Sequence, residues 1–423
     1  MDVVDRIICF VTCIILVVSV FRHFIPPAHN NACKKIEDYY SNLDHNPNCY
    51  YNPDHGLTVP EIITRYGYHV EVHAVSTEDH YVLSVFRIPH GKNANVIGNK
   101  PVYLQHGLFL NSGAFLLMGN KSLPFLLADA GYDVWLGNFR GTLYSTHVNL
   151  NEKDSEFWDF SLYEYAAYDL GAIIHLVRDV TQKKIIYIGY SYGSTAAMIY
   201  NTLNPELAKD YFKILVHIAT YGHPLEWNSW NKNVMSVWKF LLPIWKSLSY
   251  GELNFKKYTL FDWYDLCLGY PIQKKFCQPV FSLAHDFNLD KGDPETLPTV
   301  IIKGMEAISI KAYSHLTQAV LSKTLRKYDY GSTEENKMKY GTTEPPVLQL
   351  SNLNIPSYFI RGENDVISTK KNVDFIYDSL PRGIRKYPIY VVKDKNFSHG
   401  DFLWNNDVVP LVYKPIITFL NEL

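Results

Sequence analysis

The sequence predicts an α/β fold built on a mostly parallel central sheet, from three observations. Residues 185–188 form an apolar run typical of a buried strand, residues 194–203 have a helical pattern, and a five-residue turn joins them. Two later apolar runs, 357–360 and 389–392, are each followed by a polar loop, as the strands of a parallel sheet often are. The chain has 423 residues, of which 47% are hydrophobic, enough for a substantial core.

The turn between the first strand and the helix has the sequence Gly189-Tyr190-Ser191-Tyr192-Gly193. A G-x-S-x-G turn in this position is so sharp that it strains the serine backbone, and the glycines avoid side-chain clashes. The serine hydroxyl is then exposed at the top of the sheet, and the next backbone N–H is free to bind an oxyanion. Ser191 is therefore the candidate nucleophile, and a turn of small residues without a catalytic role is the alternative.

A serine nucleophile requires a base and a group that orients the base, and the two later strands supply both. The loop after 357–360 carries Asp365, and the loop after 389–392 carries His399. Loops at the carboxyl ends of parallel strands meet at one edge of the sheet, and the chain order is serine, acid, histidine. We expect His399 to accept the proton of Ser191 and Asp365 to hold the imidazole in the required tautomer.

Other residues compete for these two roles. The chain contains 16 histidines, most of which must be ordinary. Glu363, Asp394 and Asp401 are alternatives to Asp365. Asp401 is too close to His399 in sequence to orient it, so we expect it to cap or brace the histidine loop.

An oxyanion hole needs a second backbone N–H, which should follow an earlier strand. Residues 102–105 form that strand in our interpretation, and His106-Gly107-Leu108 follows it. The backbone N–H groups of Leu108 and Tyr192 are the candidate oxyanion donors. The alternative for the segment after the strand is an ordinary strand-ending turn.

The composition argues against several other classes of protein. The formal net charge of −2 provides no basic face for a nucleic acid. The sequence contains no metal-ligand spacing, phosphate loop or dinucleotide fingerprint, so we expect no metal and no cofactor. Nothing in it implies an obligate protein partner.

The N-terminal segment predicts entry into the secretory pathway. Residues 7–20 are apolar apart from Thr12 and Ser19, a length that suits a signal peptide and is short for a membrane span. We expect residues 1–20 to be a signal peptide, with an uncleaved anchor as the alternative. The protein is then extracellular or lysosomal.

Four cysteines follow this segment, which fits an oxidising compartment. Four cysteines allow three pairings, and local spacing favours Cys33–Cys49 and Cys267–Cys277. Asn120-Lys121-Ser122 is an N-glycosylation sequence that fits the same compartment.

A long insertion separates a predicted strand at 214–219 from the strand at 357–360. Within it, apolar residues recur at steps of three or four and so share one helical face. One explanation is packing against the sheet, and the other is a mainly helical lid whose apolar face meets lipid. The tryptophans of this stripe are Trp227, Trp230, Trp238 and Trp245.

The domain organisation follows from this insertion. We expect residues 21–221 and 346–423 to form the two parts of one core, and 222–345 to form the cap or lid. Lys323 to Tyr340 is polar and is expected to be a surface segment of the cap, and Pro345-Pro346 is the expected hinge back to the core.

The motifs together resemble the acid lipase family of α/β hydrolases, which includes gastric lipase and lysosomal acid lipase. The resemblance runs nearly from end to end, and it is most distinctive in residues 127–141. It implies the α/β-hydrolase fold, with a mostly parallel central sheet and a mainly helical cap. The Cys267–Cys277 pair resembles a bridge of the family, and Asn120 lies where relatives carry a glycan. Further matching segments are 62–68, 76–83, 87–89, 105–108, 157–170, 364–365 and 399–404.

The chain departs from the family pattern around the serine. The family usually has His before the serine and Gln after it, where this chain has Tyr190 and Tyr192. The backbone role of Tyr192 survives this change, but these side chains shape the acyl pocket, so the specificity is open. His80 stands where a turn glycine is usual, and Gly400 replaces a larger apolar residue.

The resemblance implies a secreted or lysosomal serine lipase that hydrolyses triacylglycerols, sterol esters or both through an acyl-enzyme. Its partners would be a lipid ester and the lipid–water interface. Two alternatives are a carboxylesterase of smaller soluble esters and a non-catalytic lipid-binding relative.

Overall fold

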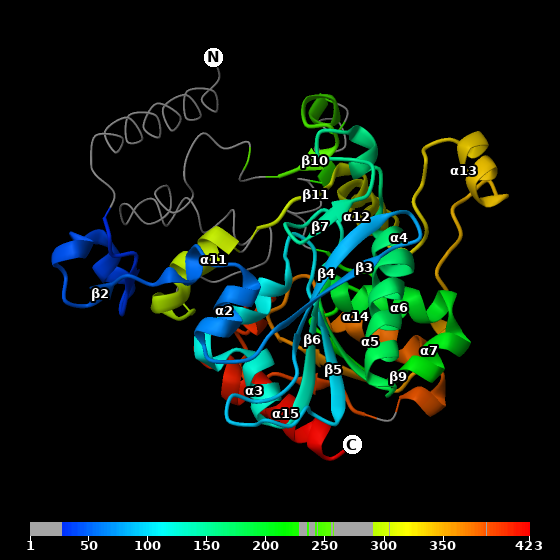
Figure 1. Cartoon of the computed structure of the whole chain (residues 1–423). Coiled ribbons are helices and arrows are strands. Elements are labelled where there is room, and N and C mark those ends of the chain that lie inside the picture. The colour runs from blue at the N-terminus through cyan, green and yellow to red at the C-terminus, as the bar shows by residue number, and fades with distance from the viewer. Residues whose placement is uncertain are drawn as a thin grey trace.

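The computed structural model describes residues 28–227, 235–236, 242, 244–254, 257, 291–303, 305–385 and 387–423. Their main element is a nine-stranded sheet with the order β13-β12-β9-β8-β5-β6-β4-β3, in which β7 also pairs with β4 (Figure 1). The strands from β13 to β6 are parallel, whereas β3, β4 and β7 are antiparallel to their neighbours. The predicted α/β fold with a mostly parallel sheet is confirmed. The strands are β3 (Glu71–Ser76), β4 (Tyr81–Ile88), β5 (Lys100–Gln105), β6 (Tyr132–Gly137), β7 (Ser145–His147), β8 (Ile185–Tyr190), β9 (Phe212–Ile218), β12 (Ser357–Arg361) and β13 (Tyr390–Val391).

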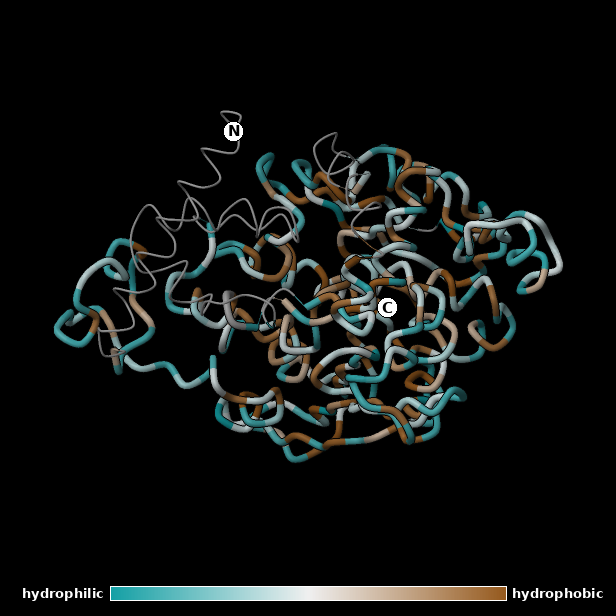
Figure 2. Tube along the Cα trace, turned by 90° about the horizontal axis from the view of Figure 1, so that it is seen from above, coloured by the Kyte–Doolittle hydropathy of each residue, from teal (hydrophilic) through white to brown (hydrophobic). Residues whose placement is uncertain are grey.

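Helices cover both faces of this sheet. Because the side chains of a strand alternate between faces, Val102 and Leu104 of β5 pack into one apolar layer and Tyr103 into the other. The hydrophobic segments accordingly gather in the middle of the molecule (Figure 2). Helices of the first layer are α2 (Val59–Arg65), α3 (Leu123–Asp129) and α15 (Lys414–Asn421). Helices of the second layer are α4 (Leu162–Glu164), α5 (Gly171–Thr181), α6 (Tyr192–Leu203), α7 (Pro205–Tyr211) and α12 (Ile310–Ser322).

Short helical turns and one further helix complete the core. Helix α14 (Lys370–Ser379) closes a smaller apolar cluster beside β12. The 3-10 turns are η1 (Ile36–Tyr40), η2 (Leu43–His45), η3 (Pro53–His55), η4 (Ser112–Leu116), η5 (Gly119–Lys121), η6 (Ser155–Trp158), η8 (Pro294–Thr296), η9 (Leu350–Asn352), η10 (Arg382–Ile384) and η11 (Gly400–Phe402). The π-helical turns are η7 (Tyr165–Leu170) and η12 (Val409–Tyr413).

Most of the predicted elements agree with the structure in position, and their ends differ for physical reasons. The strand predicted at 389–392 is only two residues long, because β13 lies at the end of the described sheet and pairs with β12 alone. The strand predicted at 214–219 ends at Ile218, because Ala219 has a φ of 48° and leaves the extended conformation. His80, in the turn between β3 and β4, has a φ of 70°, which explains why glycine is usual there.

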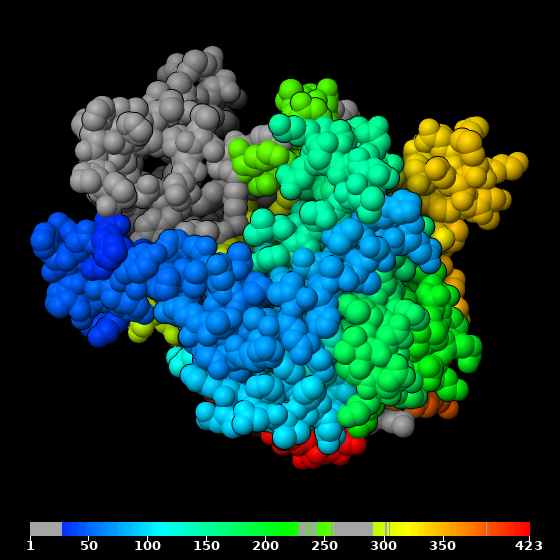
Figure 3. Space-filling model, in the orientation of Figure 1, coloured from blue at the N-terminus to red at the C-terminus, as the bar shows by residue number. Residues whose placement is uncertain are grey.

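The described part of the insertion includes two short strands and, besides α12, the helices α11 and α13. Strands β10 (Glu252–Leu253) and β11 (Ile308–Ser309) pair with each other, and α11 (Leu297–Lys303) lies beside the N-terminal segment. Helix α13 (Thr333–Tyr340) lies on an excursion that projects from the body (Figure 3). The base of the excursion is closed by the bond from Lys327 N–H to Pro346 O (2.9 Å). It is a polar surface segment, as its composition indicates.

The first described residues form a small hairpin. Its strands are β1 (Ala32–Cys33) and β2 (Cys49–Tyr50), and a Cys33–Cys49 disulfide joins them. The hairpin binds the insertion, since Tyr39 Oη donates to Pro294 O (2.7 Å). The sequon residue Asn120 is exposed. Cys267, Cys277 and the predicted signal peptide lie outside the described residues. In the part of the chain that is described, no helix is both long and apolar enough to cross a bilayer.

Three histidines in the core are buried and neutral. Burial lowers the pKa of His217 to about 3, and that of His106 and His315 to about 4. His217 on β9 joins α6 to β12, because Ser194 Oγ lies 2.7 Å from Nδ1 and Ser357 Oγ lies 3.3 Å from Nε2. Ser357 Oγ donates its own proton to a backbone carbonyl, so His217 Nε2 donates and Nδ1 accepts. This network holds no charge.

We therefore expect acidification to destabilise the fold through these histidines. An unfolded histidine binds a proton with a pKa near 6.5, whereas the folded His217 stays neutral down to much lower pH, so stability falls as pH is lowered through about 6.5. Between pH 6.5 and 4.5 this costs about 2 kcal/mol for His217. The stability advantage of the wild type over His217→Gln, measured by urea unfolding, should shrink by that amount. An advantage of the wild type that is equal at both pH values would contradict this expectation.

Candidate active site

Ser191 occupies the turn between β8 and α6, where its backbone is strained. Its φ of 53° and ψ of −118° lie outside the regions that residues with a side chain normally adopt. The neighbouring backbone holds this conformation, because Ser191 N–H donates to Ile218 O (2.9 Å) and Ser194 N–H donates to Ser191 O (3.1 Å). The hydroxyl thus stands at the N-terminus of a 12-residue helix, whose dipole favours negative charge.

Two glycines allow three segments of the chain to meet at Ser191. A Cβ atom on Gly193 would lie 2.3 Å from Gln105 O, so only glycine fits where α6 begins beside the end of β5. A Cβ atom on Gly107 would lie 3.0 Å from Ser191 Cβ and 3.4 Å from Ser191 Oγ. The loop that carries Leu108 therefore runs directly beside the candidate nucleophile.

His399 connects Ser191 to Asp365. Its Nε2 atom lies 2.9 Å from Ser191 Oγ, and its Nδ1 atom lies 2.9 Å from Asp365 Oδ2. An ionised carboxylate only accepts hydrogen bonds, so Nδ1 carries the proton and Nε2 can accept the serine proton. His399 is 2% exposed and Asp365 is 4% exposed. The structure thus brings the three residues into one hydrogen-bonded series, in which His399 and Asp365 are buried and Ser191 is partly exposed.

The acid loop holds Asp365 through its second oxygen. Asp365 Oδ1 accepts hydrogen bonds from Ile367 N–H (2.9 Å) and Ser368 N–H (2.7 Å). These bonds fix the carboxylate plane and leave Oδ2 for the imidazole. Glu363, a competitor on the same loop, is exposed.

The other two competing carboxylates have different partners. Asp394 pairs with Lys291 at 3.3 Å. Asp401 Oδ2 accepts from both Ser398 N–H (2.7 Å) and Ser398 Oγ (3.1 Å), so it braces the turn that leads into His399. Burial raises the pKa of Asp401.

The two tyrosines that flank Ser191 are both about 1% exposed. The Tyr190 hydroxyl donates to the backbone carbonyl of His399 (3.0 Å), and the two rings are 5.2 Å apart. Tyr192 lies in the apolar layer against Tyr165, and its hydroxyl donates to Leu162 O. The contact of Tyr190 with His399 was not predicted, because the two residues are 209 positions apart and no local pattern connects them.

His106 orients the peptide group that contains the Leu108 N–H. Phe139 N–H donates to His106 Nε2 (3.1 Å), so Nδ1 carries the proton and donates to Gly107 O (2.8 Å). In a trans peptide the C=O of Gly107 and the N–H of Leu108 point in opposite directions. The Leu108 N–H is therefore directed away from His106, and its orientation is set by a buried imidazole.

A buried arginine fixes the loop after β6 that supports His106. Arg140 is 1% exposed and binds Asp169 through its backbone N–H (2.9 Å) and its Nε atom (2.8 Å). Asp79 lies 2.5 Å from its Nη1 atom. Burial alone would lower the pKa of Arg140, but the two carboxylates raise it, so the guanidinium stays charged. Breaking such a buried pair from one side typically costs about 3–5 kcal/mol.

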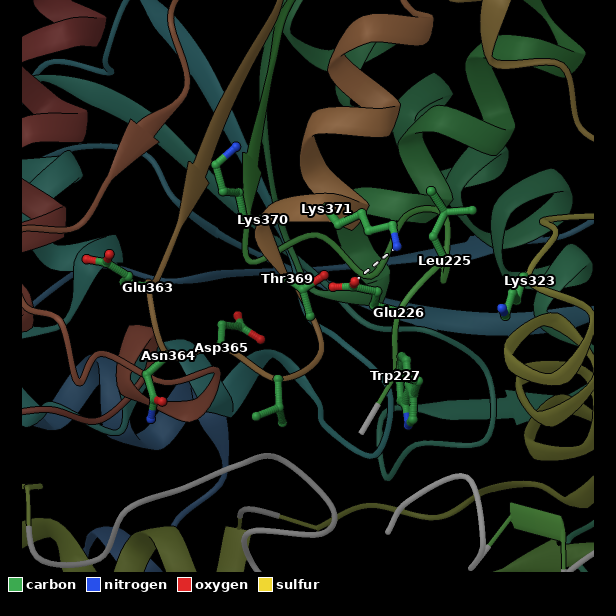
Figure 4. Close-up of a pocket in the computed structure, with 11 residues that line it drawn as sticks. Leu225, Glu226, Trp227, Lys323, Glu363, Asn364, Asp365, Thr369, Lys370 and Lys371 are labelled. Carbon is green, nitrogen blue, oxygen red and sulfur yellow. Dashed lines mark hydrogen bonds and ion pairs between the residues drawn. The ribbon is translucent and has the colours of Figure 1, made fainter. Parts of the chain in front are cut away.

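A cleft of about 590 Å³ lies beside the acid loop, where the first residues of the insertion meet α14. Lys371 points toward Glu226 across one end of it and pairs with it at 3.1 Å (Figure 4). Asn372 also binds the backbone of Glu226 twice, through Oδ1 (2.8 Å) and Nδ2 (2.9 Å). The insertion is therefore attached to the helix that follows Asp365.

Two tryptophans of the predicted lid stripe are described, and both are packed. Trp227 contacts the ring of Tyr221 edge to face at 5.8 Å. Trp245 is partly buried against a cluster that contains Phe109. Trp230 and Trp238 lie outside the described residues. In this structure the two described tryptophans thus contribute to packing.

A serine at a strand–helix turn, linked to a histidine and an acid from later loops of a mostly parallel sheet, defines an α/β hydrolase. Family comparisons agree with this class. A family model described as the partial alpha/beta-hydrolase lipase region matches residues 59–119, and the alpha/beta hydrolase fold model matches residues 100–252.

Several named proteins are similar over most of the chain. Human lipase member K is 31% identical over 88% of this chain and 92% of its own length. Human gastric triacylglycerol lipase is 32% identical over the same shares. Lipase 1 of Drosophila melanogaster is 32% identical over 87% of this chain and 81% of its own. The chain therefore belongs to the acid lipase family of α/β hydrolases, and it is a carboxylic ester hydrolase.

A solved structure supports the fold. A monoglyceride lipase of Saccharomyces cerevisiae superposes with a TM-score of 0.50 over 84% of this chain and 95% of that one. The sequence identity is 12%, so the comparison shows the fold alone.

Proposed function

We propose that this protein is a serine lipase that hydrolyses carboxylic esters of lipids through an acyl-enzyme. The observation that carries this proposal is the hydrogen-bonded series Ser191–His399–Asp365, with two distances of 2.9 Å. The similarity to gastric triacylglycerol lipases supports lipid esters, triacylglycerols or sterol esters, as substrates.

In the proposed mechanism Ser191 Oγ attacks the ester carbonyl carbon while His399 Nε2 takes the serine proton. Asp365 stabilises the imidazolium that forms. The backbone N–H groups of Leu108 and Tyr192 bind the oxyanion of the tetrahedral intermediate. His399 then gives its proton to the leaving alcohol, and a water molecule activated by the same histidine releases the fatty acid and restores Ser191.

We further propose that residues 222–345 form a cap over this site, between core parts 21–221 and 346–423. Strands β9 and β12 are neighbours in the sheet, so the chain between them must leave the core and return. Entry into the secretory pathway is part of the same proposal, supported by the Cys33–Cys49 disulfide. The Cys267–Cys277 bridge and glycosylation of Asn120 stay predictions.

A fluorophosphonate and a series of esters test the function together. We expect the phosphonate to add to Ser191, and the mass of the labelled tryptic peptide identifies the site. Such labelling would exclude a non-catalytic lipid-binding protein. We expect hydrolysis of esters to increase once the substrate exceeds its solubility and forms an interface. Full activity on dissolved short esters with none on emulsions would instead identify a carboxylesterase of soluble substrates.

A further inference from the structure

The loop that carries Leu108 adopts a backbone conformation that needs external support. Phe109, the next residue, has a φ of 59°. For a residue with a Cβ atom this left-handed conformation is sterically unfavourable, because Cβ lies close to the following carbonyl oxygen. His106 holds the loop from the core side, through Gly107 O. A contact on the other side of Leu108 must oppose relaxation of Phe109.

Glu306, in the insertion just before β11, contacts Phe109 and two neighbouring residues, Asn111 and Leu143. Its backbone N–H donates to Phe109 O (2.5 Å). Its carboxylate accepts from Asn111 Nδ2 at Oε1 (2.6 Å) and from Leu143 N–H at Oε2 (3.1 Å). Asn111 is buried, and its own Oδ1 accepts from the N–H of Gly113 (2.7 Å), so the side chain is held at both ends.

The side chain of Phe109 is held by the same part of the insertion. It packs in a buried cluster with Leu253 of β10, Ile308 of β11 and Ile310, the first residue of α12. The insertion therefore contacts both the carbonyl and the ring of Phe109. Through Asn111 it also holds the turn that begins at Asn111.

We propose that Glu306 is a positioning residue for the oxyanion hole, which couples the insertion to the Leu108 N–H. This inference rests on the proposed function. Donors to an oxyanion work only when they are preorganised, and displacement of a group by about 1 Å can cost about 10²-fold in rate. Loss of the Glu306 carboxylate contacts releases Asn111, two residues after Phe109. This lets Phe109 leave its left-handed conformation and turns the Leu108 peptide.

A donor–acceptor exchange tests this role without removing volume. In Asn111→Asp two carboxylates face each other, and the contact is repulsive. In Glu306→Gln the amide can accept from Leu143 N–H only by presenting its own NH₂ group to the NH₂ of Asn111. The double variant Glu306→Gln/Asn111→Asp restores the bonds to Asn111 and Leu143 described above, since the glutamine amide introduced at position 306 donates to the carboxylate introduced at position 111.

The readouts separate positioning from a purely structural role. For a dissolved short-chain ester we expect kcat to fall about 30-fold in Asn111→Asp, less in Glu306→Gln, and to recover to within about threefold in the double variant. KM should change less than about threefold. A trifluoromethyl ketone, which forms an oxyanion on Ser191, should lose affinity by the same factor as kcat/KM, whereas the matching alcohol should not. Glu334→Gln, on the exposed helix α13, is the matched control.

Two results would overturn the inference. One is equal loss of affinity for the ketone and the alcohol. The other is a kcat within about twofold of the wild type in Asn111→Asp despite a lower melting temperature, because Glu306 would then only fasten the insertion to the core. If the wild type itself formed no ketone adduct, the proposed function would be wrong, and the inference would fall with it.

Discussion

Replacing Ser191 by alanine is expected to lower kcat for ester hydrolysis by about four to six orders of magnitude. The reason is that Ser191 Oγ is the atom in contact with His399 Nε2, and the imidazole has no other nucleophile to activate in this series. The fold should be unchanged, because the strained backbone of Ser191 is held by backbone bonds to Ile218 and Ser194. The measurement is steady-state hydrolysis of a chromogenic ester, with the melting temperature as the test of folding.

Members of a triad act as a unit, so the double variant Ser191→Ala/His399→Ala should be hardly slower than Ser191→Ala. Ser155→Ala, at an exposed position, is the matched control and should retain full activity. Near-wild-type hydrolysis by Ser191→Ala would show that the reaction does not use this serine.

Replacing Asp365 by asparagine is the second large effect, with an expected loss of about 10⁴ in kcat. The amide oxygen can still accept from Ile367 and Ser368 N–H, so the acid loop keeps its shape. The amide NH₂ then faces His399 Nδ1 and forces that atom to accept. The imidazole proton moves to Nε2, which can no longer take the proton of Ser191.

The control for Asp365→Asn is Glu363→Gln on the same loop. Glu363 is exposed, so its amide should leave kcat within about twofold of the wild type. If Glu363→Gln were the inactive variant and Asp365→Asn the active one, the acid would be misassigned.

Local sequence was sufficient for the features that depend on a few neighbouring residues. A strand, a G-x-S-x-G turn and a helix are adjacent in sequence, so the position of Ser191 between β8 and α6 could be predicted. The strand–loop order likewise predicted that Asp365 and His399 come from neighbouring strands, because parallel strands place their following loops at one edge. Their catalytic roles stay predictions.

Contacts between residues that are far apart in sequence could not be predicted, and they decide how the candidate site is held. The bond from Tyr190 to His399 O spans 209 positions, and that from Glu306 to Asn111 spans 195. No local pattern in the sequence connects the two residues of either pair. Their pairing exists only because the sheet and the insertion bring the loops together.

The sequence by itself identified the candidate residues for the chemistry, because a sharp turn and an alternation of strands and helices are encoded within short segments. The tertiary structure decided how those residues are held. His106 could be named from its place after β5, but its neutral state and its bond to Gly107 O depend on burial and on Phe139 N–H. Burial and long-range hydrogen bonds are properties of the folded chain, and they fix the orientation of the peptide group beside Ser191.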